Sequence, residues 1–285
     1  MTVAAGSPGT GAAPAAGSPD PDAAAVRSGV AAASGLALGK PVDLDISRAW
    51  LVDPVAGREG PGEIVVRGGV LEVVTWLDGA DAEGVDDRGV VVAPGFTDLH
   101  AHFREPGNED AETIATGLAA AAHGGFTRVC LMSDSSPPLD DPAVLGRIVA
   151  ARAASGSPLE LRAFAAVTAG LAGEQLAPLG ELADAGVAGF SDDGAPLRSA
   201  ALLANALAYA GMLGLPIVDH ADDPSLSHGT EAADGLVATV LGLRGQPAAA
   251  EASGVARDIA VLADVIRDVP GARLHLAHLS TAESI

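Results

Sequence analysis

Short apolar runs alternate with Ala-rich stretches of helical length from Val91 to the end of the chain. Because parallel strands need long crossover connections, usually helices, this alternation predicts repeated βα units around a parallel sheet. Six strands are predicted, at residues 91–99, 127–132, 161–167, 187–191, 216–219 and 273–277. A complete eight-stranded βα barrel needs about 250 residues, and residues 91–285 fall short of that length. The sequence therefore predicts either an open six-stranded variant or the N-terminal portion of a longer barrel.

Two segments of different composition precede these units. Residues 1–40 consist mainly of Ala, Gly, Pro and Ser, and such a segment cannot bury enough side chain to offset the entropy of ordering it. Residues 41–90 contain short β-rich pieces separated by Gly, Pro and Asp turns. The predicted domains are a disordered extension at 1–40, a small β-sheet domain at 41–90 and an incomplete βα barrel at 91–285.

Charge and hydropathy exclude two classes of partner. The chain has 16 Lys and Arg against 37 Asp and Glu, a formal net charge of −21. This charge repels phosphate backbones and anionic lipids at long range, so neither nucleic acid nor a membrane is expected as a partner. Residues 199–218 are uncharged, but Gly and Pro interrupt them, which predicts a buried helix, a turn and a buried strand rather than a membrane span. The single cysteine, Cys130, cannot form an internal disulfide, and we expect a reducing, cytoplasmic setting.

A His-x-His motif lies at the end of the first predicted barrel strand, in the order Asp98-Leu99-His100-Ala101-His102. Side chains alternate along a strand, so His100 and His102 share one face and their imidazoles can hold one divalent ion. The alternative is a pair of surface histidines. The apolar strand and the Pro94-Gly95 pair that precede the motif favour the metal site.

Three further predicted strands end in acidic or imidazole side chains. These ends are Asp192-Asp193-Gly194, Asp219-His220 and His275-Leu276-Ala277-His278. Each of them alone is more often a capping carboxylate or an ordinary polar strand end, but active groups of βα barrels cluster at such ends. His275 and His278 are an odd number of residues apart, so they cannot both point inward from a regular strand. We expect His278 to be the ligand and His275 to pack or to support a ligand.

The stretch at 93–107, which contains the His-x-His motif and Arg104-Glu105-Pro106-Gly107, resembles the signature of dihydroorotases within the amidohydrolase superfamily. The similarity continues at residues 121–132, 167–194, 219–223 and 275–281. The resemblance implies a (β/α)8 TIM-type metal-dependent hydrolase barrel, truncated here after about six strands, with a small N-terminal β-sandwich portion. It also implies a zinc enzyme of pyrimidine biosynthesis that interconverts the small molecules N-carbamoyl-L-aspartate and L-dihydroorotate.

The same resemblance implies a set of metal ligands. His100 and His102 would hold one zinc ion, His220 and His278 a second, and Asp193 would bridge the two. Many relatives bridge their metals with a carbamylated lysine, but the only lysine of this chain is Lys40, in the predicted extension. The resemblance is therefore to the dihydroorotases whose Asp-Asp-Gly motif supplies a carboxylate bridge.

Substrate-binding roles are implied for His102, Arg104 and Asp134. Arg104 lies two residues beyond His102 and could hold a substrate carboxylate as a planar fork, unless it pairs with Glu105 or Glu109. Asp134 stands where the family has an asparagine that helps to hold this carboxylate, and an ionised aspartate there would repel it.

The family's catalytic aspartate lies on the last barrel strand and would fall beyond Ile285, so no catalytic proton carrier is assigned within the chain. We therefore expect residues 1–285 alone to be poorly soluble or molten and to lack dihydroorotase turnover. If the chain alone proved active, Asp192 and His275 would be the first candidates for that carrier.

Two other functions remain open from the sequence. One is another cyclic amidohydrolase, such as a hydantoinase or an allantoinase, and the absence of a bridging lysine argues against it. The other is a non-catalytic dihydroorotase-like partner of aspartate carbamoyltransferase, which loss of zinc ligands would favour, although none of the five is lost. The assemblies that the resemblance suggests are a homo-oligomer and a complex with aspartate carbamoyltransferase.

Overall fold

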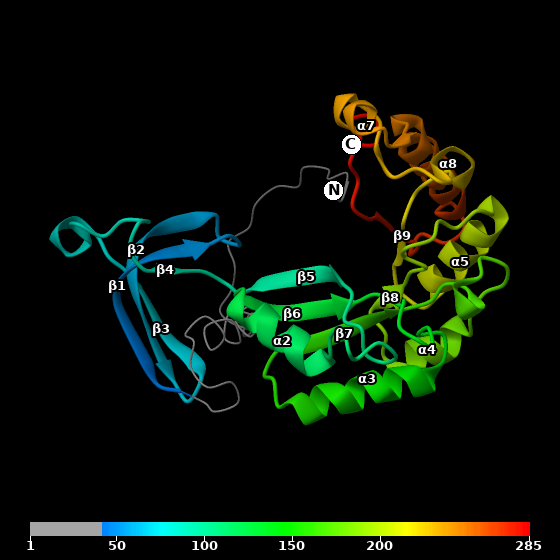
Figure 1. Ribbon diagram of the computed structural model, residues 1–285. Helices are drawn as coiled ribbons and strands as arrows, with labels where there is room; N and C mark the ends of the chain where they lie inside the picture. Colours follow the sequence, from blue (N-terminus) through cyan, green and yellow to red (C-terminus); the bar gives the residue numbers. More distant parts are fainter. Residues whose placement is uncertain (1–41) are drawn as a thin grey trace.

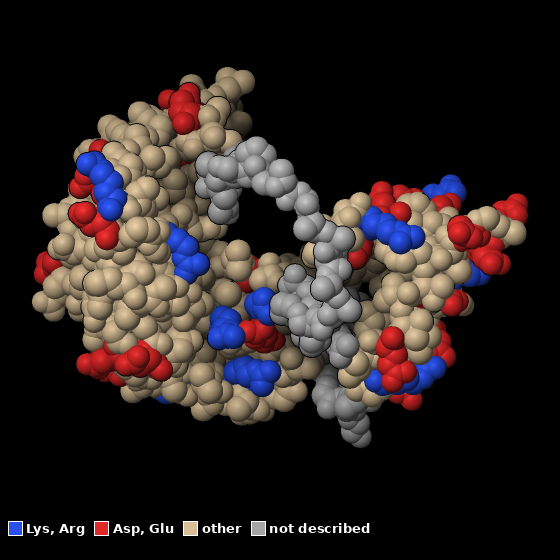
Figure 2. Space-filling view, turned by 180° about the vertical axis from the view of Figure 1, so that it is seen from behind, with Lys and Arg blue, Asp and Glu red and all other residues tan. Residues whose placement is uncertain are grey.

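The computed structural model describes residues 42–285, so the extension predicted at 1–40 lies outside the described residues. Figure 1 shows a small β-sheet beside a curved parallel sheet, with helices following the outside of the curve. No helix among residues 42–285 combines the length and the apolar character needed to cross a membrane. On the face drawn in Figure 2, the basic side chains are interspersed with acidic ones.

The small sheet has the strand order β3-β2-β1-β4. Its strands are β1 (Leu44–Asp53), β2 (Arg58–Arg67), β3 (Val70–Trp76) and β4 (Val91–Val92). The first three are antiparallel neighbours, and β4 runs parallel to β1. Four side chains form its buried core: Ala49, Leu51, Ile64 and Val66. The β-sheet structure predicted from residues 41–90 is confirmed.

The strand predicted at residues 91–99 forms two strands that belong to different sheets. Val91 and Val92 pair with β1, whereas β5 (Phe96–Ala101) begins the parallel sheet. The break falls at Pro94, which has no N–H for a ladder, and at Gly95, whose missing Cβ would lie 2.2 Å from Thr127 Cγ2. The first barrel strand therefore starts later than its apolar run suggests.

The parallel sheet has six strands in the order β12-β9-β8-β7-β6-β5. Besides β5 they are β6 (Phe126–Leu131), β7 (Glu160–Ala165), β8 (Gly189–Phe190), β9 (Ile217–Asp219) and β12 (Leu274–Leu276). All adjacent pairs are parallel, as the βα alternation predicts. A small pair, β10 (Ala232–Ala233) and β11 (Gly245–Gln246), lies in the connection between β9 and β12 and was not predicted.

Helices connect the strands and cover the outside of the sheet (Figure 1). They are α2 (Ile114–His123), α3 (Pro142–Ser155), α4 (Leu179–Ala185), α5 (Ala200–Met212), α6 (Pro224–Ser227), α7 (Leu236–Leu241) and α8 (Ala248–Val265), with 3-10 turns at Gly79–Ala82 and Ala169–Leu171. Local sequence explains the starts of two of them: the Thr113 side chain caps α2, and Asp141 caps α3 ahead of Pro142. The predicted helix, turn and strand across residues 199–218 are confirmed as α5 followed by β9.

Strand alternation divides the apolar residues between two cores. Val129 and Leu131 of β6 join the main core against the helices. Cys130 and the next residue, Met132, join a smaller cluster on the other face of the sheet with Phe164. With both faces packed, the polar groups that follow the strands are left at the carboxyl rim, where the candidate site lies.

Candidate metal centre

Two imidazoles come from the end of β5. His100 lies within the strand, His102 follows it, and their Nε2 atoms are 3.2 Å apart. The predicted shared face is therefore present. The third residue on that face, Asp98, accepts a hydrogen bond from the backbone N–H of His100 at 2.9 Å and so fixes the strand end.

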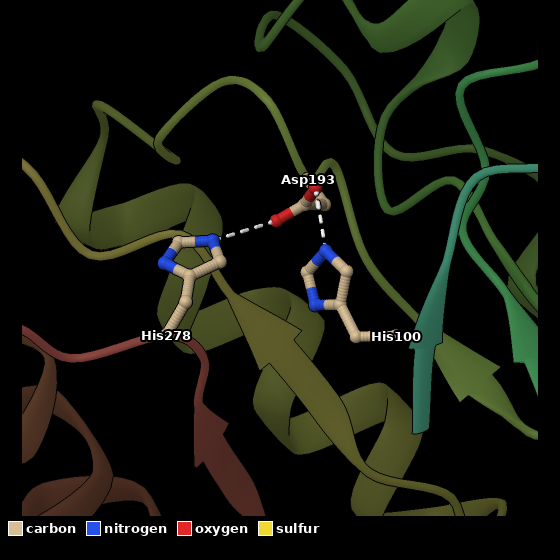
Figure 3. A group of neighbouring side chains, drawn as sticks. All are labelled: His100, Asp193 and His278. Carbon is tan, nitrogen blue, oxygen red and sulfur yellow. Dashed lines mark hydrogen bonds and ion pairs between the residues drawn. The ribbon is translucent and has the colours of Figure 1, made fainter. Parts of the chain in front are cut away.

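Asp193, which follows β8, lies at the middle of the site and is buried. Its Oδ2 lies 3.0 Å from His100 Nε2 and 3.4 Å from His102 Nε2. Its Oδ1 lies 3.0 Å from His278 Nε2 and 4.0 Å from His220 Nδ1. Figure 3 shows the neighbouring rings of His100 and His278 both pointing at this carboxylate, one at each oxygen. Each carboxylate oxygen therefore faces two imidazoles.

The second pair of imidazoles comes from two different strands. His220 follows β9, His278 lies beyond β12, and His220 Nδ1 is 3.2 Å from His278 Nε2. The backbone of His278 has a positive φ of 37°, an unusual conformation for a residue other than glycine. Of the two histidines weighed in this segment, His278 reaches the site, whereas His275 lies in β12 opposite Val218 and is exposed.

Glu251 on α8 holds the loop that carries His278. Its carboxylate accepts hydrogen bonds from the backbone N–H of Ser280 at 2.9 Å and of Thr281 at 2.9 Å, and from both hydroxyls. Burial acts to raise the pKa of Glu251, but hydrogen bonds from Ser284, Thr281 and Ser280 outweigh it and lower the pKa to about 2. This residue was not singled out from the sequence, because its partners lie about 30 positions further along the chain.

The donor set suits a divalent metal. Ligand atoms of His100, Asp193 and His278 all lie within 4.8 Å of one another. Burial acts to raise the pKa of Asp193, but the His278 hydrogen bond and the charges of His100 and His278 outweigh it, so the carboxyl pKa lies below its usual value. Burial lowers the pKa of His220 and favours its neutral form, which is the form that binds metals. Imidazole nitrogens around an ionised carboxylate are ligands that zinc prefers.

Asp134 connects the centre to Arg104. Its Oδ1 lies 2.9 Å from His102 Nδ1, and its Oδ2 lies 3.1 Å from Arg104 Nη1. Arg104 thus pairs with neither of the acids weighed from the sequence: Glu105 accepts from the backbone N–H of Ile114, and Glu109 from that of Gly107.

Asp192 faces away from the imidazoles. It is buried and accepts hydrogen bonds from the backbone N–H groups of Val167 at 2.8 Å and Thr168 at 3.0 Å, and from the Thr168 hydroxyl. Burial raises its pKa against the effect of these bonds. Its position indicates that it ties the end of β7 to the loop after β8, which orients the adjacent Asp193.

A second acidic pair lies beneath His220. Asp219 at the end of β9 and Asp258 on α8 are both buried, and Arg257 Nη2 lies 2.6 Å from Asp258 Oδ1. Burial and the neighbouring Asp258 raise the pKa of Asp219 to about 8. Asp258 was not singled out from the sequence, although an acid in the apolar face of α8 is a signal of this kind.

The curled parallel sheet, with imidazoles gathered around one buried carboxylate at its carboxyl rim, has the arrangement of a metal-binding TIM-type barrel. Two solved structures share this fold. L-hydantoinase from Arthrobacter aurescens gives a TM-score of 0.58 at 17% identity, over 85% of this chain and 54% of that one. A D-hydantoinase gives 0.57 at 16% identity, over 85% and 53%.

The sequence matches the Dihydro-orotase-like family over residues 89–284, and the chain belongs to that family. The dihydroorotase of Pelotomaculum thermopropionicum is 43% identical over 241 residues, which cover 84% of this chain and 55% of the relative. The dihydroorotase of Streptomyces coelicolor is 41% identical over 234 residues, covering 81% and 53%. The chain thus spans about half the length of the curated relatives that it matches.

Proposed function

We propose that the protein is a dihydroorotase, which interconverts N-carbamoyl-L-aspartate and L-dihydroorotate in pyrimidine biosynthesis. The observation that carries the proposal is the Asp193 carboxylate with two imidazoles at each oxygen. Family membership supports the reaction class. The five side chains that we propose as ligands, His100, His102, Asp193, His220 and His278, lie together at the rim, which supports the proposed site. A cytoplasmic location is part of the proposal, and the buried free thiol of Cys130 is compatible with it.

The metal complement that we propose is two zinc ions per chain. His100 and His102 would hold one ion, His220 and His278 the other, and the Asp193 carboxylate would be shared by both. Such a pair of ions supplies a bound water of near-neutral pKa and polarises the amide carbonyl. Because Asp193 is buried, its carboxylate is fixed in place and sets the separation of the two ligand pairs.

The residues of the chain also account for substrate orientation. Arg104 carries its guanidinium at the edge of the imidazole cluster, where it would bind the carboxylate that both substrates share. Asp134 links Arg104 to the ring of His102, which we propose as a metal ligand. A substrate held by its carboxylate at Arg104 would therefore present its amide to the centre.

A chimera tests this proposal. Residues 1–285 are followed by the C-terminal part of the P. thermopropionicum relative that the chain does not cover, and both directions of the dihydroorotate reaction are measured. We expect turnover that the Asp193→Ala variant abolishes. Residues 1–285 alone are the comparison and should show none. A folded, metal-loaded chimera that acts on hydantoin or allantoin but not on dihydroorotate would contradict the proposal.

A further inference from the structure

The Asp134 carboxylate contacts two functional side chains at once. One oxygen lies 2.9 Å from His102 Nδ1 and the other 3.1 Å from Arg104 Nη1. His102 and Arg104 belong to the loop after β5, whereas Asp134 belongs to the loop after β6. A single acid therefore joins a candidate metal ligand to a candidate substrate-binding cation.

The contact between these two loops is fixed by backbone packing. The N–H of Ser136 donates to the carbonyl of Pro106 at 2.9 Å. Gly107 lies so close to Ser136 that an added Cβ would meet the Ser136 carbonyl oxygen at 2.1 Å, and its φ is 109°. Because only glycine fits there, the loops are held together two to three residues from Asp134 and Arg104.

We propose that Asp134 is a positioning residue with two roles. It orients His102 toward the metal centre, and it pairs with Arg104 until an anionic substrate replaces Asp134 as the partner of Arg104. The part concerning substrate rests on the proposed function. The part concerning His102 requires only that the imidazole cluster binds a metal.

The His102 ring explains the first part. With its Nδ1–H donated to Asp134, the ring keeps a lone pair on Nε2, which faces Asp193 Oδ2 and His100. Carboxylates that accept from the far nitrogen of a ligating histidine fix its tautomer and orientation, and removing them costs about 10- to 100-fold in metal affinity.

The Arg104 side chain explains the second part. It is 44% exposed and donates to Asp134 through Nη1, while a guanidinium has five donors and can bind a carboxylate with two of them. A substrate carboxylate arriving at Arg104 would share one positive charge with Asp134. Asp134 thus weakens anion binding, and an asparagine at this position would not.

Three variants of the full chain separate this role from that of a surface ion pair. Asp134→Ala removes the acceptor for His102 and the partner of Arg104. Asp134→Asn keeps a carbonyl oxygen for His102 but releases Arg104. Glu160→Gln is the control, because Glu160 also pairs with arginines, through Arg128 Nε at 2.7 Å, and is comparably exposed.

The first measurement is Co²⁺ affinity, followed by chelator competition and by the visible absorption of the bound ion. We expect Asp134→Ala to weaken Co²⁺ binding about 10-fold or more, with Asp134→Asn restoring most of the loss and Glu160→Gln unchanged. Wild-type affinity and an unaltered cobalt spectrum in Asp134→Ala would overturn the role toward His102.

The second measurement is calorimetric binding of N-carbamoyl-L-aspartate to the metal-loaded chain. We expect Asp134→Asn to bind it several-fold more tightly than the wild type, because the substitution removes a negative charge that repels the ligand's carboxylates next to Arg104. Equal or weaker binding by Asp134→Asn would overturn the role toward Arg104. If no variant bound this ligand, the substrate part would fall together with the proposed function, and the cobalt result would still decide the role toward His102.

Discussion

At the scale of single residues, Asp193 combines burial with an ionised carboxylate that imidazoles approach at both oxygens. His100 and His102 come from one strand end, so their spacing is set by local alternation. His220 and His278 come from two strand ends, and their spacing depends on the curl of the sheet and on the strained backbone of His278. The second pair is therefore the more sensitive to changes outside the site.

Replacing His278 by alanine tests the ligand assignment. We expect His278→Ala to reduce bound zinc from about two ions per chain to about one, because it removes one of the two imidazoles at Asp193 Oδ1. His123→Ala is the control, since His123 is the exposed last residue of α2. Elemental analysis gives the number of zinc ions per chain in both variants. An unchanged number in His278→Ala would show that this residue is not a ligand.

The sequence predicted that these five side chains gather at one place, because each stands at or just beyond a strand end and the strand ends of a parallel sheet share one rim. Contacts between loops could not be predicted from the sequence. Arg104 was expected to bind substrate or pair with a nearby acid, but its partner is Asp134, 30 positions away. That contact depends on how two loops return toward each other, and alternation along a strand carries no information about this.

At the scale of elements, α8 supports the two strands that carry the second imidazole pair. Glu251 near its start holds the loop after β12, and Asp258 two turns later lies against the end of β9. The helix itself was expected from the βα alternation. Its polar contacts were not, because the sequence shows acids on a helix but not what they face.

Glu251→Gln tests the loop contact through acid stability. The folded-state pKa of Glu251, about 2, lies below the ordinary 4.5, so its stabilising effect is present above about pH 4.5 and is lost as the pH falls toward 2. We expect Glu251→Gln to lower the free energy of unfolding near neutrality by on the order of 1 to 3 kcal/mol. The variant should also lose less of its stability than the wild type as the pH falls from 4.5 toward 2.

Denaturant unfolding at several pH values measures the effect, and Glu181→Gln on an exposed position of α4 is the control. If the free energy of unfolding fell as steeply with decreasing pH in Glu251→Gln as in the wild type, the contact would not hold the loop.

Asp219→Asn tests the buried acid pair. The folded-state pKa of Asp219, about 8, lies above the ordinary 3.8, so its contribution to stability falls as the pH rises from about 4 through 8. The amide keeps a donor toward Asp258 at every pH. We therefore expect the metal-free Asp219→Asn protein to lose the decline in unfolding free energy between pH 5 and pH 9, whereas Asp184→Asn, at an exposed position of α4, should keep it. The same decline in Asp219→Asn and in the wild type would show that titration of Asp219 is not its cause.

At the scale of the whole molecule, the six-stranded sheet has two edges, β5 and β12. The number of its strands follows from the βα alternation, and their sequential order is that of the TIM-type barrel that the family resemblance implies. The sequence misplaced the start of the first strand and did not predict β10 and β11, because a strand of two residues is too short to show a period.

These edges predict self-association. Phe96 and Leu99 of β5 are 63% and 54% exposed, and an edge strand with apolar side chains is a template for pairing with another chain. We expect residues 1–285 to have limited solubility and to associate with rising concentration in sedimentation velocity, despite the charge of −21. The chimera with the relative's C-terminal part should not. A chain that stays monomeric and soluble at high concentration would show that its edges are protected.

The metal centre is tested by the number of metal ions bound per chain, measured by elemental analysis after zinc loading and gel filtration. We predict about two zinc ions in the wild type and less than one in Asp193→Ala, because that carboxylate faces both imidazole pairs. A folded wild-type protein without bound metal, or an Asp193→Ala variant that binds as much as the wild type, would contradict the assignment of this rim as a metal centre.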